Sequence, residues 1–229
     1  MIPIRDDAPK STTPFINYFL IALNILVFLF ELQLTGRQRN AFDLTFGFVP
    51  YRIDLWLAGV QPAAYAFVPL VTSMFLHAGW LHLIFNMWWL AIFGDNVEDR
   101  LGHFPYLLFY LVTGLIATLT NLAFTLHSKI PSVGASGAIA GIMGAYFFLF
   151  PRARVLTWFV VFVFWLPAWL VLGYWFVLQF LSGAATSITY ASNSTGGVAF
   201  WAHVGGFISG LFLIKLVPTR KRYYSFEDY

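Results

Sequence analysis

The chain has 229 residues, of which 59% are hydrophobic and only 10% are charged. Because a soluble domain carries about 25% charged residues, this composition excludes an ordinary soluble protein and indicates an integral membrane protein, with a length that fits one compact domain. The sequence contains no cysteine, which excludes disulfides and thiolate metal sites, and its net charge of +3 includes no basic patch that would suggest nucleic acid.

The first fourteen residues are polar, and the apolar run that begins at Phe15 is long enough to cross a bilayer core of about 30 Å. The run lacks a small-residue cleavage pattern, so we interpret it as an uncleaved first span rather than a signal peptide. The fold class predicted is an all-α polytopic membrane protein with six transmembrane helices. We expect a single domain, 1–229, with a core at 15–217 and a basic tail at 218–229. The predicted spans are 15–34, 77–97, 104–125, 136–150, 157–181 and 199–217.

Two connections between the predicted spans have a distinctive composition. Residues 35–76 include several aromatic side chains, which predicts an interfacial or partly embedded loop. Residues 182–197 are small and polar, which predicts a flexible loop at the membrane surface.

The basic residues are sorted by side. If the N-terminus is cytoplasmic, nine Lys and Arg residues lie inside and four outside, which favours two cytoplasmic termini. The short termini, with no appended soluble domain, favour a prokaryotic inner membrane. The four outside residues are Arg37, Arg39, Arg52 and Lys129.

The fourth span is short, and it begins at a serine. Ser136 precedes Arg152 by 16 residues, which is about 24 Å at about 1.5 Å per residue. With Arg152 at the cytoplasmic face, Ser136 lies several ångströms below the outer surface of the hydrocarbon core. Irregular backbone at that depth is tolerated only inside protein or beside a water-filled cavity, so we expect a hydrated pocket around Ser136.

Three further polar residues fall near the same depth. The same rise per residue places His203, His82 and Asn86 about 22, 24 and 18 Å from the inner face. Polar side chains inside a membrane are candidates for function, so these residues and Ser136 form the candidate site.

Ser136 alone fits two explanations, because serine is a normal small residue at helix interfaces. Small residues also recur every four positions on the fourth and sixth spans, which predicts that these faces pack together. This packing brings Ser136 and His203 to the same end of one close contact. We therefore expect the Ser136 Oγ and a His203 ring nitrogen within about 2.6–3.5 Å. The small residues are Gly137, Gly141 and Ala145 on one span and Ala202, Gly206 and Gly210 on the other.

A structural hydrogen bond would also explain His203 in isolation, but a histidine beside a serine can remove the hydroxyl proton and return it to a leaving group. Backbone N–H groups at the helix start around Ser136 suit a developing oxyanion. His82 and Asn86 share one helix face and can donate to the same oxyanion, although an interhelical polar contact would also explain them. His77 lies off that face and is expected to support the nearby loop. The three histidines lack the acids or cysteines that would complete a metal site.

No Asp or Glu lies between Leu101 and Phe226, so the last four spans offer His203 no carboxylate. The prediction is a Ser–His dyad rather than a triad. The same absence argues against a small-molecule transporter coupled to protons, which usually needs embedded carboxylates.

These motifs resemble the rhomboid family of intramembrane serine proteases over about residues 15–217. The resemblance rests on the segment from His77 to Asn86, on Gly134-Ala-Ser136-Gly137, and on Ala202-His203-Val-Gly-Gly206, in the family's order. It implies a nucleophile at Ser136, a base at His203, and an oxyanion hole formed by His82, Asn86 and the Ser136 N–H. It further implies transmembrane protein substrates in the lipid bilayer, no cofactor, a cap at 182–197 and a lateral gate formed by the fifth span.

The chain departs from the family pattern at two places. Many members have Trp-Arg where this chain has Val68-Pro69 in the first loop, and some have a tyrosine that stacks on the histidine where this chain has Ala140. We expect an aromatic residue of the fifth span to replace that tyrosine. A catalytically inactive, client-binding relative is the alternative function, but such proteins typically lack the serine or the histidine.

Overall fold

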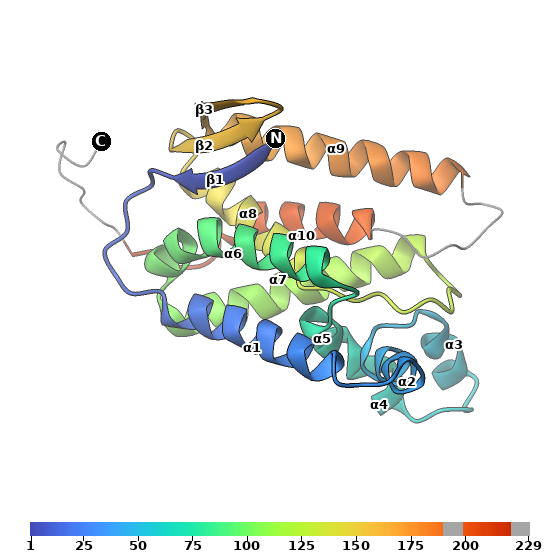
Figure 1. Ribbon diagram of the computed structural model, residues 1–229. Coiled ribbons are helices and arrows are strands. Elements are labelled where there is room, and N and C mark those ends of the chain that lie inside the picture. The colour runs from blue at the N-terminus through green and yellow to red at the C-terminus, as the bar shows by residue number, and fades with distance from the viewer. Residues whose placement is uncertain (190–198, 221–229) are drawn as a thin grey trace.

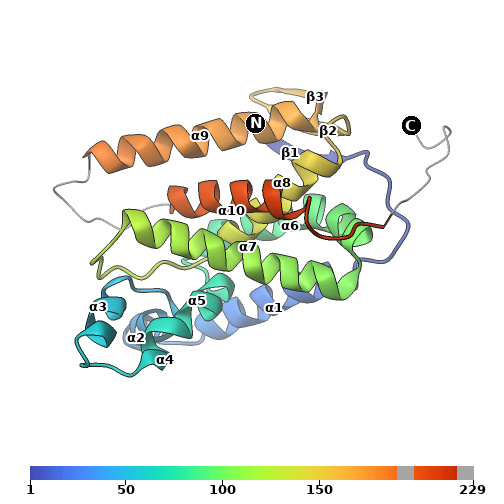
Figure 2. The ribbon, with the colours of Figure 1, turned by 180° about the vertical axis from the view of Figure 1, so that it is seen from behind.

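The computed structural model describes residues 1–189 and 199–220, and this part of the chain is mostly helical. Figures 1 and 2 show long helices packed side by side, with a small sheet near one end of the bundle and several short helices at the other. The long helices are α1 (Phe15–Glu31), α6 (Trp80–Leu101), α7 (His103–Phe124), α8 (Ser136–Leu149), α9 (Ala168–Thr189) and α10 (Phe200–Leu213).

Among the described residues, α7 and the segment Ala168–Ser187 are long and apolar enough to cross a membrane. A third span is possible if Ala63–Phe75 and α6, which meet at a bend of 75°, count as one. The helices α1, α8 and α10 are apolar but shorter. The six-span count therefore stays a prediction, although the order of the six long helices follows the six predicted segments.

The short helix α8 forms the centre of the bundle. Every residue of Gly137–Tyr146 is buried, because this segment carries only apolar or small side chains except for Tyr146 and packs against α6, α7 and α10. A Cβ added at Gly206 would collide with the Gly137 carbonyl oxygen, and one at Gly210 would collide with the Gly141 backbone. The predicted packing of the two small-residue faces is thus present, with backbone against backbone.

The expectation of an all-α fold is wrong at the N-terminus and before α9. The strands β1 (Ile2–Asp6), β2 (Arg154–Phe159) and β3 (Phe162–Pro167) form an antiparallel sheet in the order β1-β2-β3. The predicted span 157–181 therefore begins too early, since the helix starts at Ala168. The run from Val155 to Leu166 is rich in valine and aromatic residues, which favour strands, and hydropathy alone cannot distinguish such a run from a helix.

Other boundaries also differ from the prediction. The helix α9 continues to Thr189, so the first half of the predicted loop 182–197 is helical, and its remainder lies outside the described residues. His77 precedes α6 rather than belonging to it. The predicted loop 35–76 contains α2 (Gly36–Phe46), α3 (Tyr51–Leu57), α4 (Ala63–Phe67), α5 (Pro69–Thr72) and the 3-10 turn η1 (Ser73–Phe75).

Polar contacts fasten the N-terminal segment to the end of the bundle that is predicted to be cytoplasmic. The Lys10 ammonium lies 2.6 Å from an Asp95 oxygen, and the Arg154 guanidinium lies 2.7 Å from Asp7. The Tyr146 hydroxyl donates a hydrogen bond to Asp6, and burial raises the pKa of the Asp6 carboxyl to about 7. These contacts hold the N-terminal segment against α6, α8 and β2.

Candidate active site

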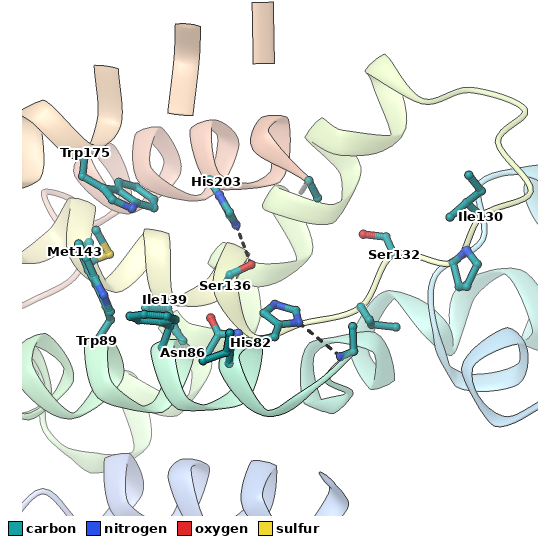
Figure 3. A pocket seen from close by; sticks show the side chains of 16 residues that line it. His82, Asn86, Trp89, Ile130, Ser132, Ser136, Ile139, Met143, Trp175 and His203 are labelled. Atoms are coloured by element: carbon teal, nitrogen blue, oxygen red, sulfur yellow. Dashed lines mark hydrogen bonds between the residues drawn. The ribbon is translucent and has the colours of Figure 1, made fainter. Parts of the chain in front are cut away.

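Ser136 and His203 face each other across the contact between α8 and α10. The Ser136 Oγ lies 2.7 Å from the His203 Nε2, within the distance expected from the sequence (Figure 3). His203 is buried, with an exposed fraction of 8%, whereas Ser136 is half-buried. This geometry suits the transfer of the hydroxyl proton to the imidazole.

The loop before α8 brings Ser136 to the helix start in a fixed orientation. Gly134 has a φ of +131°, a conformation that favours glycine, and its N–H donates to the Ser73 carbonyl at 2.8 Å. A Cβ at Gly134 would lie 2.7 Å from the His82 ring. Gly134 therefore allows the serine loop and the imidazole of His82 to touch.

His82 lies beside the serine with one ring nitrogen engaged. Its Nδ1 accepts a hydrogen bond from the Ala78 N–H at 3.4 Å. An accepting Nδ1 places the proton of a neutral imidazole on Nε2, the nitrogen nearer to Gly134. The ring of His82 can thus donate a hydrogen bond into the pocket next to Ser136.

Asn86 follows His82 by one helical turn and lines the same pocket (Figure 3). Its side chain is buried, and its Nδ2 has no hydrogen-bond partner within the part of the chain that the structure describes. An unpaired buried donor is costly in an apolar interior. The amide of Asn86 is therefore free to bind negative charge that develops on a ligand.

His77 packs against His82 as an aromatic support. Its ring is 1% exposed and meets the His82 ring edge-on at 5.1 Å between centroids. The His77 carbonyl accepts a hydrogen bond of 2.9 Å from Arg39, a residue of α2. Arg39 thus anchors the turn before α6. Val68 and Pro69, at the start of α5, carry no cationic side chain.

Two residues of α9 contact His203, and one of them was missed from the sequence. The Trp175 ring lies 5.7 Å from the His203 ring, which is the aromatic contact expected from the fifth span in place of Ala140. The Gln179 Oε1 lies 2.7 Å from the His203 Nδ1. A polar side chain in a predicted membrane span was the signal that could have identified Gln179.

A cavity of about 700 Å³ opens beside these groups. Apolar side chains of α6, of α8 and of the loop at 130–133 contribute to its wall, and Trp89 of α6 approaches Trp175, its one lining residue from α9, at 5.8 Å between ring centroids. Within the described residues, no group of three or more His, Asp or Glu side chains could hold a metal ion. The arrangement can therefore supply a nucleophile, a base and hydrogen-bond donors to an extended, apolar ligand.

Comparison with known proteins gives one family. Residues 65–220 match the Rhomboid domain model. The chain is 33% identical over 152 residues to RHOMBOID-like protein 6, mitochondrial, of Arabidopsis thaliana, covering 65% of the chain and 44% of the relative. It is 34% identical over 140 residues to Rhomboid protease GluP of Bacillus subtilis, covering 61% of the chain and 25% of the relative. The chain thus spans less than half the length of these two relatives.

Proposed function

Because the chain belongs to the rhomboid family, we propose that it is an intramembrane serine endopeptidase that cleaves transmembrane segments of other membrane proteins. The observation that carries the proposal is the 2.7 Å contact between the Ser136 Oγ and the His203 Nε2. Its surroundings support the same reaction, because His82 and Asn86 line the cavity beside the serine, and the Asn86 Nδ2 is unpaired within the described residues.

The proposed reaction begins with proton transfer. His203 Nε2 takes the Ser136 hydroxyl proton as the Oγ attacks the carbonyl carbon of the scissile peptide bond. The resulting oxyanion accepts hydrogen bonds from His82, Asn86 and the Ser136 backbone N–H. His203 then gives its proton to the leaving amine, and the C–N bond breaks. Water, activated by the same histidine, hydrolyses the acyl-enzyme and frees the serine.

The proposed oxyanion hole uses donors from α6 and α8. The proposed donors of His82 and Asn86 come from one face of α6, and the backbone donor comes from the start of α8, where the first N–H groups have no helical acceptor. Since Asn86 Nδ2 is unpaired in the described residues, binding the oxyanion requires no existing hydrogen bond of this amide to break. This pre-organisation favours the transition state over the bound peptide.

The proposed route of the substrate follows from the residues that line the cavity. Trp175 lies on α9, which packs chiefly against α10 and presents a largely exposed apolar surface. We propose that a transmembrane segment enters laterally where α9 and α6 meet, between Trp175 and Trp89. The proposed location is a prokaryotic inner membrane. The proposed orientation has both termini cytoplasmic, as the distribution of basic residues favours.

The test uses purified protein in liposomes with a labelled single-span substrate. The expected result is cleavage by the native chain and its loss in Ser136→Ala and in His203→Ala. A matched control is Ser132→Ala, which removes a hydroxyl from the nearby loop and should leave the cleavage products unchanged. Cleavage at the native rate by Ser136→Ala would show that the reaction does not use this serine. Binding of the substrate without cleavage by the native chain would instead indicate a client-binding protein.

A further inference from the structure

We propose that Gln179 is a positioning residue that fixes the tautomer and orientation of His203 and makes both depend on the position of α9. The inference rests on the proposed function and extends the predicted dyad by a neutral third member. Gln179 belongs to a different helix from Ser136 and His203, so three helices meet at this hydrogen-bond chain.

The two hydrogen bonds of the imidazole define its proton. The Gln179 Oε1 and the His203 Nδ1 lie 2.7 Å apart. Since a carbonyl oxygen of an amide can only accept, Nδ1 must carry the hydrogen. The lone pair of Nε2 then faces the Ser136 hydroxyl, also at 2.7 Å. With Oε1 of Gln179 turned toward the ring, the opposite tautomer would place two acceptors against each other at Nδ1 and a donor against the serine, so the amide in this orientation favours the form that can act as a base.

An amide suits this place better than the carboxylate of a soluble triad. No Asp or Glu occurs between Leu101 and Phe226, and an ionised acid beside a buried histidine in a membrane carries a large desolvation cost. The amide remains an acceptor after proton transfer, because the imidazolium keeps its Nδ1–H. It therefore orients the base throughout the reaction without burying a permanent charge.

Gln179 and Trp175 are four residues apart and share one face of α9. Both contact His203, Gln179 through the ring Nδ1 and Trp175 through a tilted packing of the two rings. A movement of α9 away from α10 removes both contacts at once. His203 is therefore fully aligned only while α9 is docked as it is here, which couples the competence of the base to the helix at the proposed entrance.

The first test is made on the native chain. Nitrogen-15 NMR of histidine-labelled protein, with the His203 signals assigned by their loss in His203→Ala, reports which ring nitrogen is protonated. The expected result is a neutral His203 with hydrogen on Nδ1. Hydrogen on Nε2 would overturn the proposal, whatever the behaviour of any variant.

The second test compares variants with a small fluorophosphonate, which reacts with an activated serine and needs no lateral entry. We expect Gln179→Met to lower the labelling rate about 10- to 100-fold, because the buried ring N–H loses its acceptor. Gln179→Glu keeps an accepting oxygen in its neutral form, which buries no charge, and should stay within about threefold of the native rate. Leu178→Ala, a change on the exposed side of α9, is the matched control and should label normally.

The outcomes separate this inference from the proposed function. Labelling of Gln179→Met at the native rate would overturn the role of Gln179 while leaving Ser136 as the nucleophile. Equal loss in Gln179→Met and Gln179→Glu, with unchanged unfolding temperatures, would also overturn it, because rescue by the acceptor is its distinguishing result. Labelling that persists in Ser136→Ala would instead remove the proposed function itself.

Discussion

The substitution Asn86→Leu separates a catalytic amide from a structural one. Asn86 is buried, and its Nδ2 has no partner within the described residues, so leucine, of similar size, removes no protein hydrogen bond of this donor. Loss of one oxyanion donor should lower kcat about 10- to 1000-fold. Removal of an unpaired buried donor should stabilise the fold by about 1 kcal/mol, which raises Tm by about 2–4 °C for a chain of this size.

The assay measures cleavage of a transmembrane substrate and thermal unfolding on the same preparations. Asn24→Leu is the control, because Asn24 is also a fully buried amide but bonds the Leu20 carbonyl in α1, away from the pocket. It should leave kcat unchanged. An Asn86→Leu chain with native kcat, or one whose Tm falls by several degrees, would refute the reasoning, since either result would make Asn86 an ordinary interhelical contact.

Three further results are expected. Gly210→Ala should lower kcat/KM, because the added methyl pushes α10 off the Gly141 backbone and so separates the dyad. Ile208→Ala, on an exposed face of α10, should not, and equal activities would contradict this link. Gly183→Cys with Phe200→Cys should form a disulfide, since a Gly183 Cβ would lie 3.4 Å from the Phe200 Cβ. The oxidised variant should still react with fluorophosphonate, but it should cleave the transmembrane substrate slowly until the disulfide is reduced. Undiminished cleavage by the oxidised variant would count against lateral entry beside α9. Because burial raises the pKa of Asp6 to about 7, the folded state holds a proton that the unfolded chain releases above about pH 4. Tm should therefore fall as the pH rises from about 4 to about 7. A decrease of Tm with pH that is equally steep in Asp6→Asn would contradict this.

The sequence predicted the contact between Ser136 and His203 because helix geometry alone fixes depth and face. The helical rise per residue placed Ser136 and His203 at a similar depth in the membrane. The spacing of Gly137, Gly206 and the neighbouring small residues indicated which helix faces pack together. These arguments need only local periodicity. They survive errors of a few residues at helix ends.

Gln179 and the hairpin that begins at Arg154 could not be predicted in the same way. The rotation of α9 about its axis decides whether Gln179 faces His203 or lipid, and that rotation depends on packing against α10. The run from Val155 to Leu166 is almost continuously apolar, so its hydrophobic periodicity cannot distinguish a strand from a helix. Pairing with β1, about 150 residues earlier in the chain, makes the hairpin part of a sheet, and no local pattern reports such a partner.

The most direct test of the central claim is to map where a fluorophosphonate attaches to the folded chain. The account predicts one adduct, on Ser136, formed by the native protein and slowed by at least about 100-fold in His203→Ala, since removal of the base leaves the hydroxyl unactivated. Mass spectrometry of the digested protein locates the adduct among the serine-containing peptides. An adduct on another serine, or equal labelling of Ser136 in the presence and absence of His203, would contradict the account.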